Sequence, residues 1–312
     1  MFSSISLLAI GLIFLLKGAD MLIKSAHHMG QRFNIPPLLI GLFILGIGTS
    51  IPELAITLVS QVTGQESIGL GTIIGSNIFN MLFILGLTAV ISGISFKKVW
   101  ISRDLLWNFL AVLIVFIFSV LTSPGLITQP EAVILLFLLA LWLFLSIKGQ
   151  PLGAPESVNI HTPSYYSFFW GIAGFIGVLL GGQWVVSGAA SLAAIIGLSE
   201  WFIGLVIIGI GTSLPELVVT LKAALKGQQV LAIGNIIGSN IFDFLGIIGI
   251  AGIIKPIGFQ NAFLPDLLFA LASAGILYGV FKFKREKKAA LLLGLSAIAL
   301  YLLYFLLVIW RG

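Results

Sequence analysis

The chain has no cysteine, and charged residues make up only 9% of its 312 residues. Without cysteine it can form no disulfide, no thiolate metal site and no cysteine nucleophile. A soluble domain carries about 25% charged residues, so this chain, which is 59% hydrophobic, is expected to lie in a lipid bilayer. The formal charge of +5 does not indicate a nucleic acid partner, because the basic residues fall in short loops rather than on one folded face.

Apolar runs of about 20 residues recur along the chain, each long enough to cross a hydrocarbon core of about 30 Å as a helix. They predict an all-α polytopic membrane protein with ten transmembrane helices. The expected spans are residues 2–23, 37–60, 67–92, 104–122, 128–148, 167–190, 201–226, 228–253, 263–281 and 288–310. The first run lacks a basic leader and a small-residue cleavage site, so we expect a retained span rather than a signal peptide. The tightest connections are expected at 60–67 and 226–228.

Thirteen of the 16 Lys and Arg residues fall on one side of this predicted topology. They are Lys24, Arg32, Lys97, Lys98, Arg103, Lys148, Lys222, Lys226, Lys282, Lys284, Arg285, Lys287 and Lys288. Lys255 and Arg311 fall on the opposite side, and Lys17 lies within the first span, where we expect either a local ion pair with Asp20 or a snorkelling side chain. The positive-inside rule makes the basic side cytoplasmic, so both termini are predicted outside in a multi-pass protein of the cell (inner) membrane.

Two sequence blocks occur twice in the chain. Residues 41–53 read GLFILGIGTSIPE and residues 204–216 read GLVIIGIGTSLPE, while residues 71–80 read GTIIGSNIFN and residues 234–243 read GNIIGSNIFD. The members of each pair are 163 positions apart. Such self-similarity indicates a duplication.

Each half would hold five spans, an odd number, so the second copy is expected to enter the membrane from the opposite side. Residues 1–148 form the first predicted five-helix repeat, 149–166 a polar linker and 167–312 the second repeat. Inverted repeats are typical of secondary transporters, which place substrate near the bilayer midplane beside helices broken by Gly or Pro. We therefore expect broken helices at the midplane.

The GTSIPE segment predicts such a break. Pro52 removes an amide donor and clashes with the carbonyl four residues back, which breaks or kinks the helix. Gly46 and Gly48 loosen the same turn, so carbonyls near Gly46 and Thr49 can point away from the helix axis. The second copy repeats this arrangement with Gly209, Gly211, Thr212 and Pro215.

Acidic and amide residues fall deep in the predicted spans. Glu53 lies about 24 Å along the second span at about 1.5 Å per residue, and Asn80, Glu216 and Asp243 lie at comparable depth. A charge at mid-bilayer costs at least about 2.5–3.5 kcal/mol, so these groups should face a partner or a cavity. Hydroxyls join them from Thr49, Ser50, Ser76, Thr212, Ser213 and Ser239. The four motif segments contain no basic residue, and an all-oxygen set favours a hard cation such as Ca2+ or Na+.

The paired GTS(I/L)PE and G(T/N)IIGSNIF(N/D) blocks resemble the alpha repeats of the Ca2+/cation antiporter superfamily, in its sodium/calcium exchanger branch of prokaryotic type without a regulatory domain. This resemblance implies Na+-driven Ca2+ transport without a cofactor. It implies that Glu53 and Glu216 hold Ca2+ together with main-chain oxygens at Thr49 and Thr212. The implied Na+ ligands are Ser50, Ser76, Ser213, Ser239, Asn80, Asp243 and the carbonyls of Gly46 and Gly209.

The family's branches differ at a few of these positions. The proton-coupled branch tends to carry glutamate where this chain has Asn80 and Asp243, and the potassium-dependent branch tends to carry aspartate where it has Glu216. Both comparisons favour plain Na+ coupling.

Other interpretations of the motifs remain open. The same acids could accept protons in an H+-coupled Ca2+ antiporter, or could form the selectivity element of a cation channel. Enzymatic function is not expected, because the chain has no HExxH motif, no cysteine and no histidine in the motif segments. Asn77 and Asn240 are expected to cap or bridge the broken helices rather than bind ions, and the motif glycines serve either helix packing or ligand access. The oligomeric state cannot be derived from the sequence.

Overall fold

The computed structural model describes residues 2–33, 35–64, 66–92, 99–148, 164–195, 209–260, 263–283 and 287–311. Most of the predicted linker and the start of the predicted span 201–226 lie outside the described residues. In chain order the elements are α1 (Phe2–Phe33), α2 (Pro37–Leu39), η1 (Ile40–Leu45), α3 (Gly46–Thr49), α4 (Ile51–Thr63), α5 (Glu66–Ile78), η2 (Phe79–Ile84), α6 (Leu85–Ser92), α7 (Val99–Phe116), η3 (Ile117–Thr122), β1 (Leu126–Ile127), α8 (Gln129–Lys148), α9 (Ser164–Ile195), α11 (Gly209–Gly211), α12 (Leu214–Leu225), α13 (Gln229–Ile241), η5 (Phe242–Ile247), α14 (Ile248–Ile254), β2 (Ile257–Gly258), α15 (Leu264–Phe283) and α16 (Lys287–Arg311). Elements labelled η are π-helices.

Seven helical stretches in the described part of the chain are long and apolar enough to cross a membrane, or eight if one bent pair counts as a single span. The bent pair, Pro37–Thr49 with Ile51–Val62, coincides with the expected span 37–60, and the shorter apolar helix Leu264–Val280 coincides with 263–281. The chain is thus an α-helical, multi-pass membrane protein. The count of ten spans and the inversion of the repeats stay predictions.

The chain folds into two compact units that do not follow the two predicted halves. The first unit combines Met1–Pro52 with Pro151–Asn235, and the second combines Glu53–Gln150 with Ile236–Gly312. Each unit therefore contains one part of both repeats.

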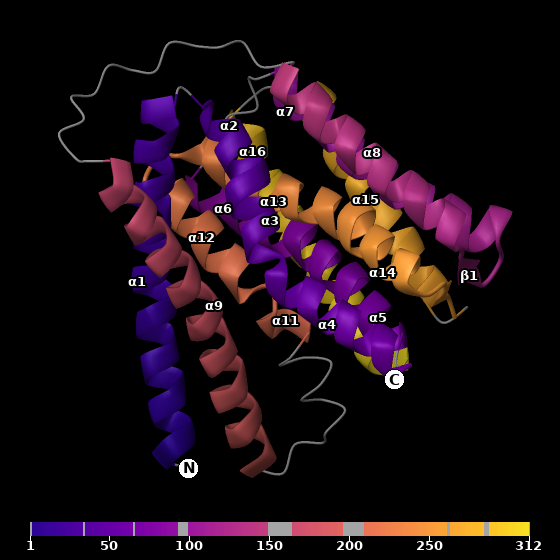
Figure 1. Cartoon of the computed structure of the whole chain (residues 1–312), viewed down its shortest axis with the longest axis horizontal. Coiled ribbons are helices and arrows are strands. Elements are labelled where there is room, and N and C mark those ends of the chain that lie inside the picture. Colours follow the sequence, from indigo (N-terminus) through magenta and orange to yellow (C-terminus); the bar gives the residue numbers. More distant parts are fainter. Residues whose placement is uncertain are drawn as a thin grey trace. The chain divides into compact units, whose positions relative to one another are not determined.

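In the first unit, the long helices α1 and α9 lie side by side (Figure 1). Glycines allow their backbones to touch: a Cβ added at Gly18 would come within 2.7 Å of the Gly174 carbonyl oxygen and of the Val178 nitrogen. Such close approach is how helices associate inside a bilayer, where the hydrophobic effect gives no driving force between them. Leu15, Ala19 and their neighbours on α1 complete a buried apolar interface.

An ion pair joins α1 to α12 within the same unit. The Asp20 carboxylate lies 2.5 Å from Lys222 Nζ and 2.6 Å from Lys226 Nζ. Among the described residues Asp20 therefore pairs with these two lysines instead of Lys17, and the alternative that Lys17 snorkels stays a prediction. The reason is tertiary: two lysines one turn apart on α12 reach the same carboxylate, which a sequence window around Asp20 does not contain.

The two tight connections predicted from the sequence are confirmed. Gly64 joins α4 to α5 and Gly227 joins α12 to α13, and both glycines have φ of +76°. Only glycine adopts this left-handed conformation without strain, and it is the usual residue just after a helix. At the second turn the Gly227 amide donates to the Ala224 carbonyl at 3.0 Å. The glycines are 163 positions apart, so the duplication extends to the turns.

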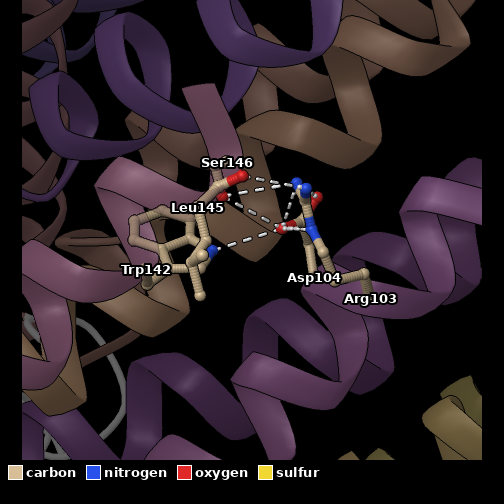
Figure 2. A network of polar contacts seen from close by, with 5 residues as sticks. All are labelled: Arg103, Asp104, Trp142, Leu145 and Ser146. Atoms are coloured by element: carbon tan, nitrogen blue, oxygen red, sulfur yellow. Dashed lines mark hydrogen bonds and ion pairs between the residues drawn. The ribbon is translucent and has the colours of Figure 1, made fainter. Parts of the chain in front are cut away.

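In the second unit, a polar network joins the start of α7 to the end of α8 (Figure 2). Asp104 is fully buried and pairs with Arg103 at 3.0 Å. Its carboxylate also accepts hydrogen bonds from Trp142 Nε1 at 3.2 Å and from Ser146 Oγ at 3.3 Å, while Arg103 donates to the Leu145 carbonyl. The charge of this acid is therefore balanced inside the protein, as a structural carboxylate requires.

The other end of α8 begins with a capping box. The Glu131 carboxylate accepts from the Thr128 backbone amide at 2.8 Å and from the Thr128 hydroxyl at 2.7 Å. It also accepts from Thr122 and Ser123, so four donors surround this acid. The bond from the Thr128 amide to the Glu131 carboxylate is one half of the capping box of an S/T-x-x-E segment, and it assigns Glu131 a structural role.

A corner of the second unit is held by Glu66 at the start of α5. Its carboxylate lies 2.6 Å from Lys255 Nζ and accepts from the Gly258 amide of β2, which pairs antiparallel with β1. Gln61 donates to the Lys255 carbonyl at 2.6 Å. Glu66 lies outside the membrane-spanning stretches. The hydrogen bond from Lys255, followed by that from Gly258, lowers the pKa of Glu66 below its ordinary value of 4.5.

The lowered pKa of Glu66 makes this corner sensitive to acid. The folded chain binds the Glu66 proton less tightly than the unfolded chain, so the stabilisation is fully present above pH 4.5 and is lost as the pH falls through the lowered value. Because the Lys255 side chain is 56% exposed, the pair is worth less than about 1 kcal/mol. We expect Glu66→Gln to lower the thermal unfolding midpoint slightly at pH 7. The difference in midpoint between wild type and variant should shrink as the pH falls through the lowered pKa of Glu66. A difference that stays constant down to the lowest pH measured would contradict this assignment.

Candidate cation site

The candidate site begins at two broken helices. Ser50 separates α3 from α4 with φ −82° and ψ 7°, and Ser213 separates α11 from α12 with φ −86° and ψ 6°. Pro52 and Pro215 are the second residues of the helices that follow, where a missing amide costs no hydrogen bond. The first break bends the span by 42°. The predicted breaks are confirmed and lie two residues before each proline, because the proline ring excludes a helical carbonyl in the turn before it.

Glu53 and Glu216 occupy the first turns of α4 and α12. Each carboxylate residue is only 1% exposed. A helix N-terminus stabilises a nearby negative charge by about 0.3–1 kcal/mol. That is less than the cost of at least about 2.5–3.5 kcal/mol for an acid at mid-bilayer. A helix dipole alone would therefore offset only part of the cost that the predicted mid-bilayer position imposes on each carboxylate.

In the first unit, residues of the two GTS(I/L)PE copies come together. The Ser50 hydroxyl donates to Glu216 Oε1 at 3.5 Å. The residue at the helix break of the first copy therefore contacts the glutamate of the second copy. The Thr49 hydroxyl lies 3.0 Å from the Leu45 carbonyl and 3.3 Å from Asn235 Oδ1. Thr49 and Ser50 are fully buried. The motif therefore places hydroxyl and carboxylate oxygens together inside the unit.

In the second unit, the paired GSNIF blocks come together. Asn77 Nδ2 donates to Asp243 Oδ2 at 2.8 Å, and Asn80 Nδ2 donates to Asn240 Oδ1 at 3.1 Å. The bridging role expected for Asn77 and Asn240 agrees with these bonds. All four side chains are buried.

Asn80 and Asp243 lie in π-helices, which the sequence analysis did not predict. They occupy equivalent positions in η2 and η5, two six-residue elements related by the 163-residue repeat. π-helical turns inside α-helices are rare and frequent at functional sites, because they redirect side chains that a regular helix would align. The repetition of the same irregularity shows that it belongs to the duplicated motif.

Three buried oxygens of the motif segments have no hydrogen-bond partner among the described residues. They are Ser213 Oγ in the first unit, and Asn77 Oδ1 and Asn80 Oδ1 in the second. An orphaned buried polar atom costs about 1–3 kcal/mol. Neutral oxygens of amides and hydroxyls are ligands that Na+ and Ca2+ accept, so a hard cation would satisfy them. The donor set thus fits the ion class predicted from the sequence.

Four more predicted ligands are buried. They are Thr212, Ser76, Ser239 and Gly46, and Ser76 donates to the Ile73 carbonyl at 3.2 Å. Gly46 begins α3 and Gly209 begins α11. Within the described residues, no three His, Asp or Glu side chains gather in a way that could hold a metal. The convergence of Glu53, Glu216 and Asp243 on one ion therefore stays a prediction. Any such site needs amide, hydroxyl and main-chain oxygens beside its carboxylates.

The sequence analysis missed one buried group, the side chain of Asn235 on α13. Its amide donates to Thr220 Oγ1 at 2.9 Å and to the Glu216 carbonyl at 3.5 Å. The only signal in the sequence is a difference between the repeats, since Thr72 occupies the equivalent position.

Comparisons with known proteins agree with this geometry. A family model described as sodium/calcium exchanger protein matches residues 3–148 and again 166–310. The inner membrane protein YrbG of Escherichia coli (strain K12) is 34% identical over 263 residues, which cover 80% of each chain. Sodium/calcium exchanger MaX1 of Methanosarcina acetivorans is 26% identical over 293 residues, which cover 80% of this chain and 83% of that one.

Solved structures of the sodium-calcium exchanger NCX_Mj have the same fold. The structure soaked with 2.5 mM Na+ and 0.1 mM Ca2+ matches with a TM-score of 0.84 at 28% identity and covers 97% of both chains. The structure soaked with 100 mM Na+ and 10 mM Sr2+ matches with a TM-score of 0.85 and covers 97% of this chain and 98% of that one. With a family model that matches both halves, broken helices and buried acids in its repeated motifs, and this shared fold, the chain belongs to the sodium/calcium exchanger family.

Proposed function

We propose that the chain is a secondary antiporter that exchanges Ca2+ for Na+ across the cell (inner) membrane by alternating access to one central acidic site. The observation that carries the proposal is the pair Glu53 and Glu216, each buried in the first turn after a broken helix. The relatives MaX1 and NCX_Mj are named as exchangers of sodium and calcium, which supports the same pair of ions here.

Ca2+ would bind to the side chains of Glu53 and Glu216 and to the main-chain oxygens of Thr49 and Thr212. The turns at Ser50 and Ser213 support the main-chain part, because residues just before a helix break have carbonyls that no helical amide needs. Na+ would use Asn80, Asp243, the carbonyls of Gly46 and Gly209, and the hydroxyls of Ser50, Ser76, Ser213 and Ser239.

Exchange follows from charge balance at such a site. Two buried carboxylates are neutralised either by one divalent ion or by more than one monovalent ion. Without a load, the uncompensated charges are costly in the bilayer, so the empty protein should change its access slowly. Each ion therefore has to replace the other, which makes transport an exchange rather than a leak.

The proposal includes a membrane arrangement. Residues 1–148 and 167–312 would form two inverted five-helix repeats joined by the linker 149–166, with both termini outside. Alternating access would then come from movement of one set of helices against the other around the bound ion. The substrates are ions, and no cofactor or nucleic acid has a part in this scheme.

Ion gradients imposed one at a time on vesicles test the proposed coupling. Purified protein is reconstituted, and Ca2+ uptake is measured with an outward gradient of Na+, H+ or K+ while the membrane potential is clamped. We expect the Na+ gradient alone to accelerate uptake, because several Na+ ions leaving the site must be replaced by Ca2+. Acceleration by the pH gradient would instead assign H+ coupling. Uptake that needs no counter-ion gradient would identify a channel, and either result contradicts Na+/Ca2+ exchange.

A further inference from the structure

Asn235 connects two parts of the candidate site. Its side chain is fully buried on α13 in the first unit. Its Nδ2 donates to Thr220 Oγ1 at 2.9 Å and to the Glu216 carbonyl at 3.5 Å. Its Oδ1 lies 3.3 Å from Thr49 Oγ1, and it shares that hydroxyl with the Leu45 carbonyl at 3.0 Å and the Gly46 carbonyl at 3.4 Å. The amide thus joins the last residue before the first helix break to the first turn after the second break.

The backbone around Asn235 packs closely against the segment that leads into the first break. A Cβ added at Gly234 would come within 3.0 Å of the Leu38 carbonyl oxygen, and one added at Gly41 within 2.6 Å of the Leu231 carbonyl oxygen. These two glycines therefore allow the backbone of α13 to touch residues 37–45. In this arrangement Asn235 Oδ1 lies 3.3 Å from Thr49 Oγ1.

Among the described residues, the equivalent position of the other repeat makes no such connection. Thr72 is half-buried, and its hydroxyl donates to the Ile68 carbonyl of its own helix at 2.9 Å. The buried amide of Asn235, in contrast, donates and accepts across helices. The two copies of the block therefore differ in structure at the position where they differ in sequence.

We infer that Asn235 is a positioning residue that sets the Ca2+ affinity of the site by fixing Thr49 relative to Glu216. This inference rests on the proposed function, in which the Thr49 main chain and the Glu216 carboxylate both bind Ca2+. The hydrogen-bond partners of Asn235 described above are Thr49, Glu216 and Thr220, and none of them is a Na+ ligand in the proposed function, so we expect a smaller effect on Na+. The difference between Asn235 and Thr72 in the two repeats should therefore affect the affinity for Ca2+ more than the affinity for Na+.

Exchanging the residue types of the two repeats tests the inference. We expect Asn235→Thr to raise the apparent KM for Ca2+ about tenfold, because the buried network loses its amide. The kcat per folded protein and the apparent Na+ affinity should stay close to wild type. Thr72→Asn is the matched control and should leave all three quantities unchanged. An unchanged Ca2+ KM in Asn235→Thr, or an equal rise in Thr72→Asn, would overturn the inference.

A second variant separates positioning from a general loss of stability. Thr49→Val keeps the volume and the main-chain oxygen but removes the hydroxyl that donates to Asn235. We expect it to raise the Ca2+ KM as well, and the double variant with Asn235→Thr to show less than the product of the two effects, because both remove one connection. Multiplicative effects, or a fall in the ion-free thermal midpoint with no change in KM, would show that Asn235 only supports the fold.

Ca2+ binding measured without Na+ distinguishes this inference from the proposed function. The midpoint shift that Ca2+ causes in detergent is recorded for wild type, Asn235→Thr and Thr72→Asn. A wild-type chain that binds Ca2+ but does not exchange it for Na+ would refute the proposed coupling alone. A reduced Ca2+ shift confined to Asn235→Thr would still support the positioning role, and equal shifts in all three proteins would overturn it.

Discussion

Glu216→Gln is expected to abolish Ca2+ transport, and Glu53→Gln should have the same effect. Each change keeps the shape of the side chain but removes one of two charges that a divalent ion would need in a buried site. Charge-assisted contacts are the strong ones, so we expect Ca2+ affinity to fall by about 100-fold or more in either variant. The measurement is Ca2+ binding to purified protein by calorimetry, together with Na+-dependent uptake into vesicles.

Glu66→Gln is the matched control for these variants. It makes the same chemical change at an acid that pairs with Lys255 outside the membrane-spanning stretches. This control should retain Ca2+ binding and transport. Na+-dependent Ca2+ uptake that survives in Glu53→Gln or in Glu216→Gln would contradict the assignment of that residue to the Ca2+ site.

Asp243→Asn should separate the monovalent half of the cycle from the divalent half. We expect it to keep Ca2+ binding far better than Glu216→Gln while it loses the acceleration of uptake by Na+. The fold should tolerate the change, because the amide oxygen of the substituted side chain can accept the hydrogen bond that Asn77 Nδ2 donates to Asp243. The measurement is Ca2+ affinity and its dependence on Na+ in both variants.

Equal loss of Ca2+ binding in Asp243→Asn and Glu216→Gln would remove the proposed division of ligands. In that case Asp243 would belong to the Ca2+ site itself. If Ca2+ uptake by Asp243→Asn still depends fully on Na+, Asp243 is not one of the Na+ ligands.

The sequence predicted the parts of the structure that local chemistry determines. Proline after GTS predicted the breaks now seen at Ser50 and Ser213, and the apolar runs predicted the membrane-spanning helices. The deep acids were predicted to be buried, and Glu53 and Glu216 are. These features need only a few neighbouring residues and the general cost of placing a charge in lipid.

Other features could not be predicted, because they depend on tertiary contacts or on small differences in helix winding. The π-helices around Asn80 and Asp243 lie in uniformly apolar runs, where a pattern of hydrophobic residues cannot distinguish one helix type from another. Asp20 pairs with lysines about 200 residues away rather than with Lys17. Asn235 differed from Thr72 in the repeat, but only the structure shows that the difference changes hydrogen bonding.

The central claim is that Glu53 and Glu216 bind the same Ca2+ ion. Diffraction from crystals soaked with Ca2+ tests it most directly, since the anomalous signal locates the ion. We predict one Ca2+ with oxygens of both carboxylates at about 2.3–2.6 Å, and its loss when Na+ replaces Ca2+ in the soak. A Ca2+ ion bound by only one of the two glutamates, or carboxylates too far apart to share an ion, would contradict the account.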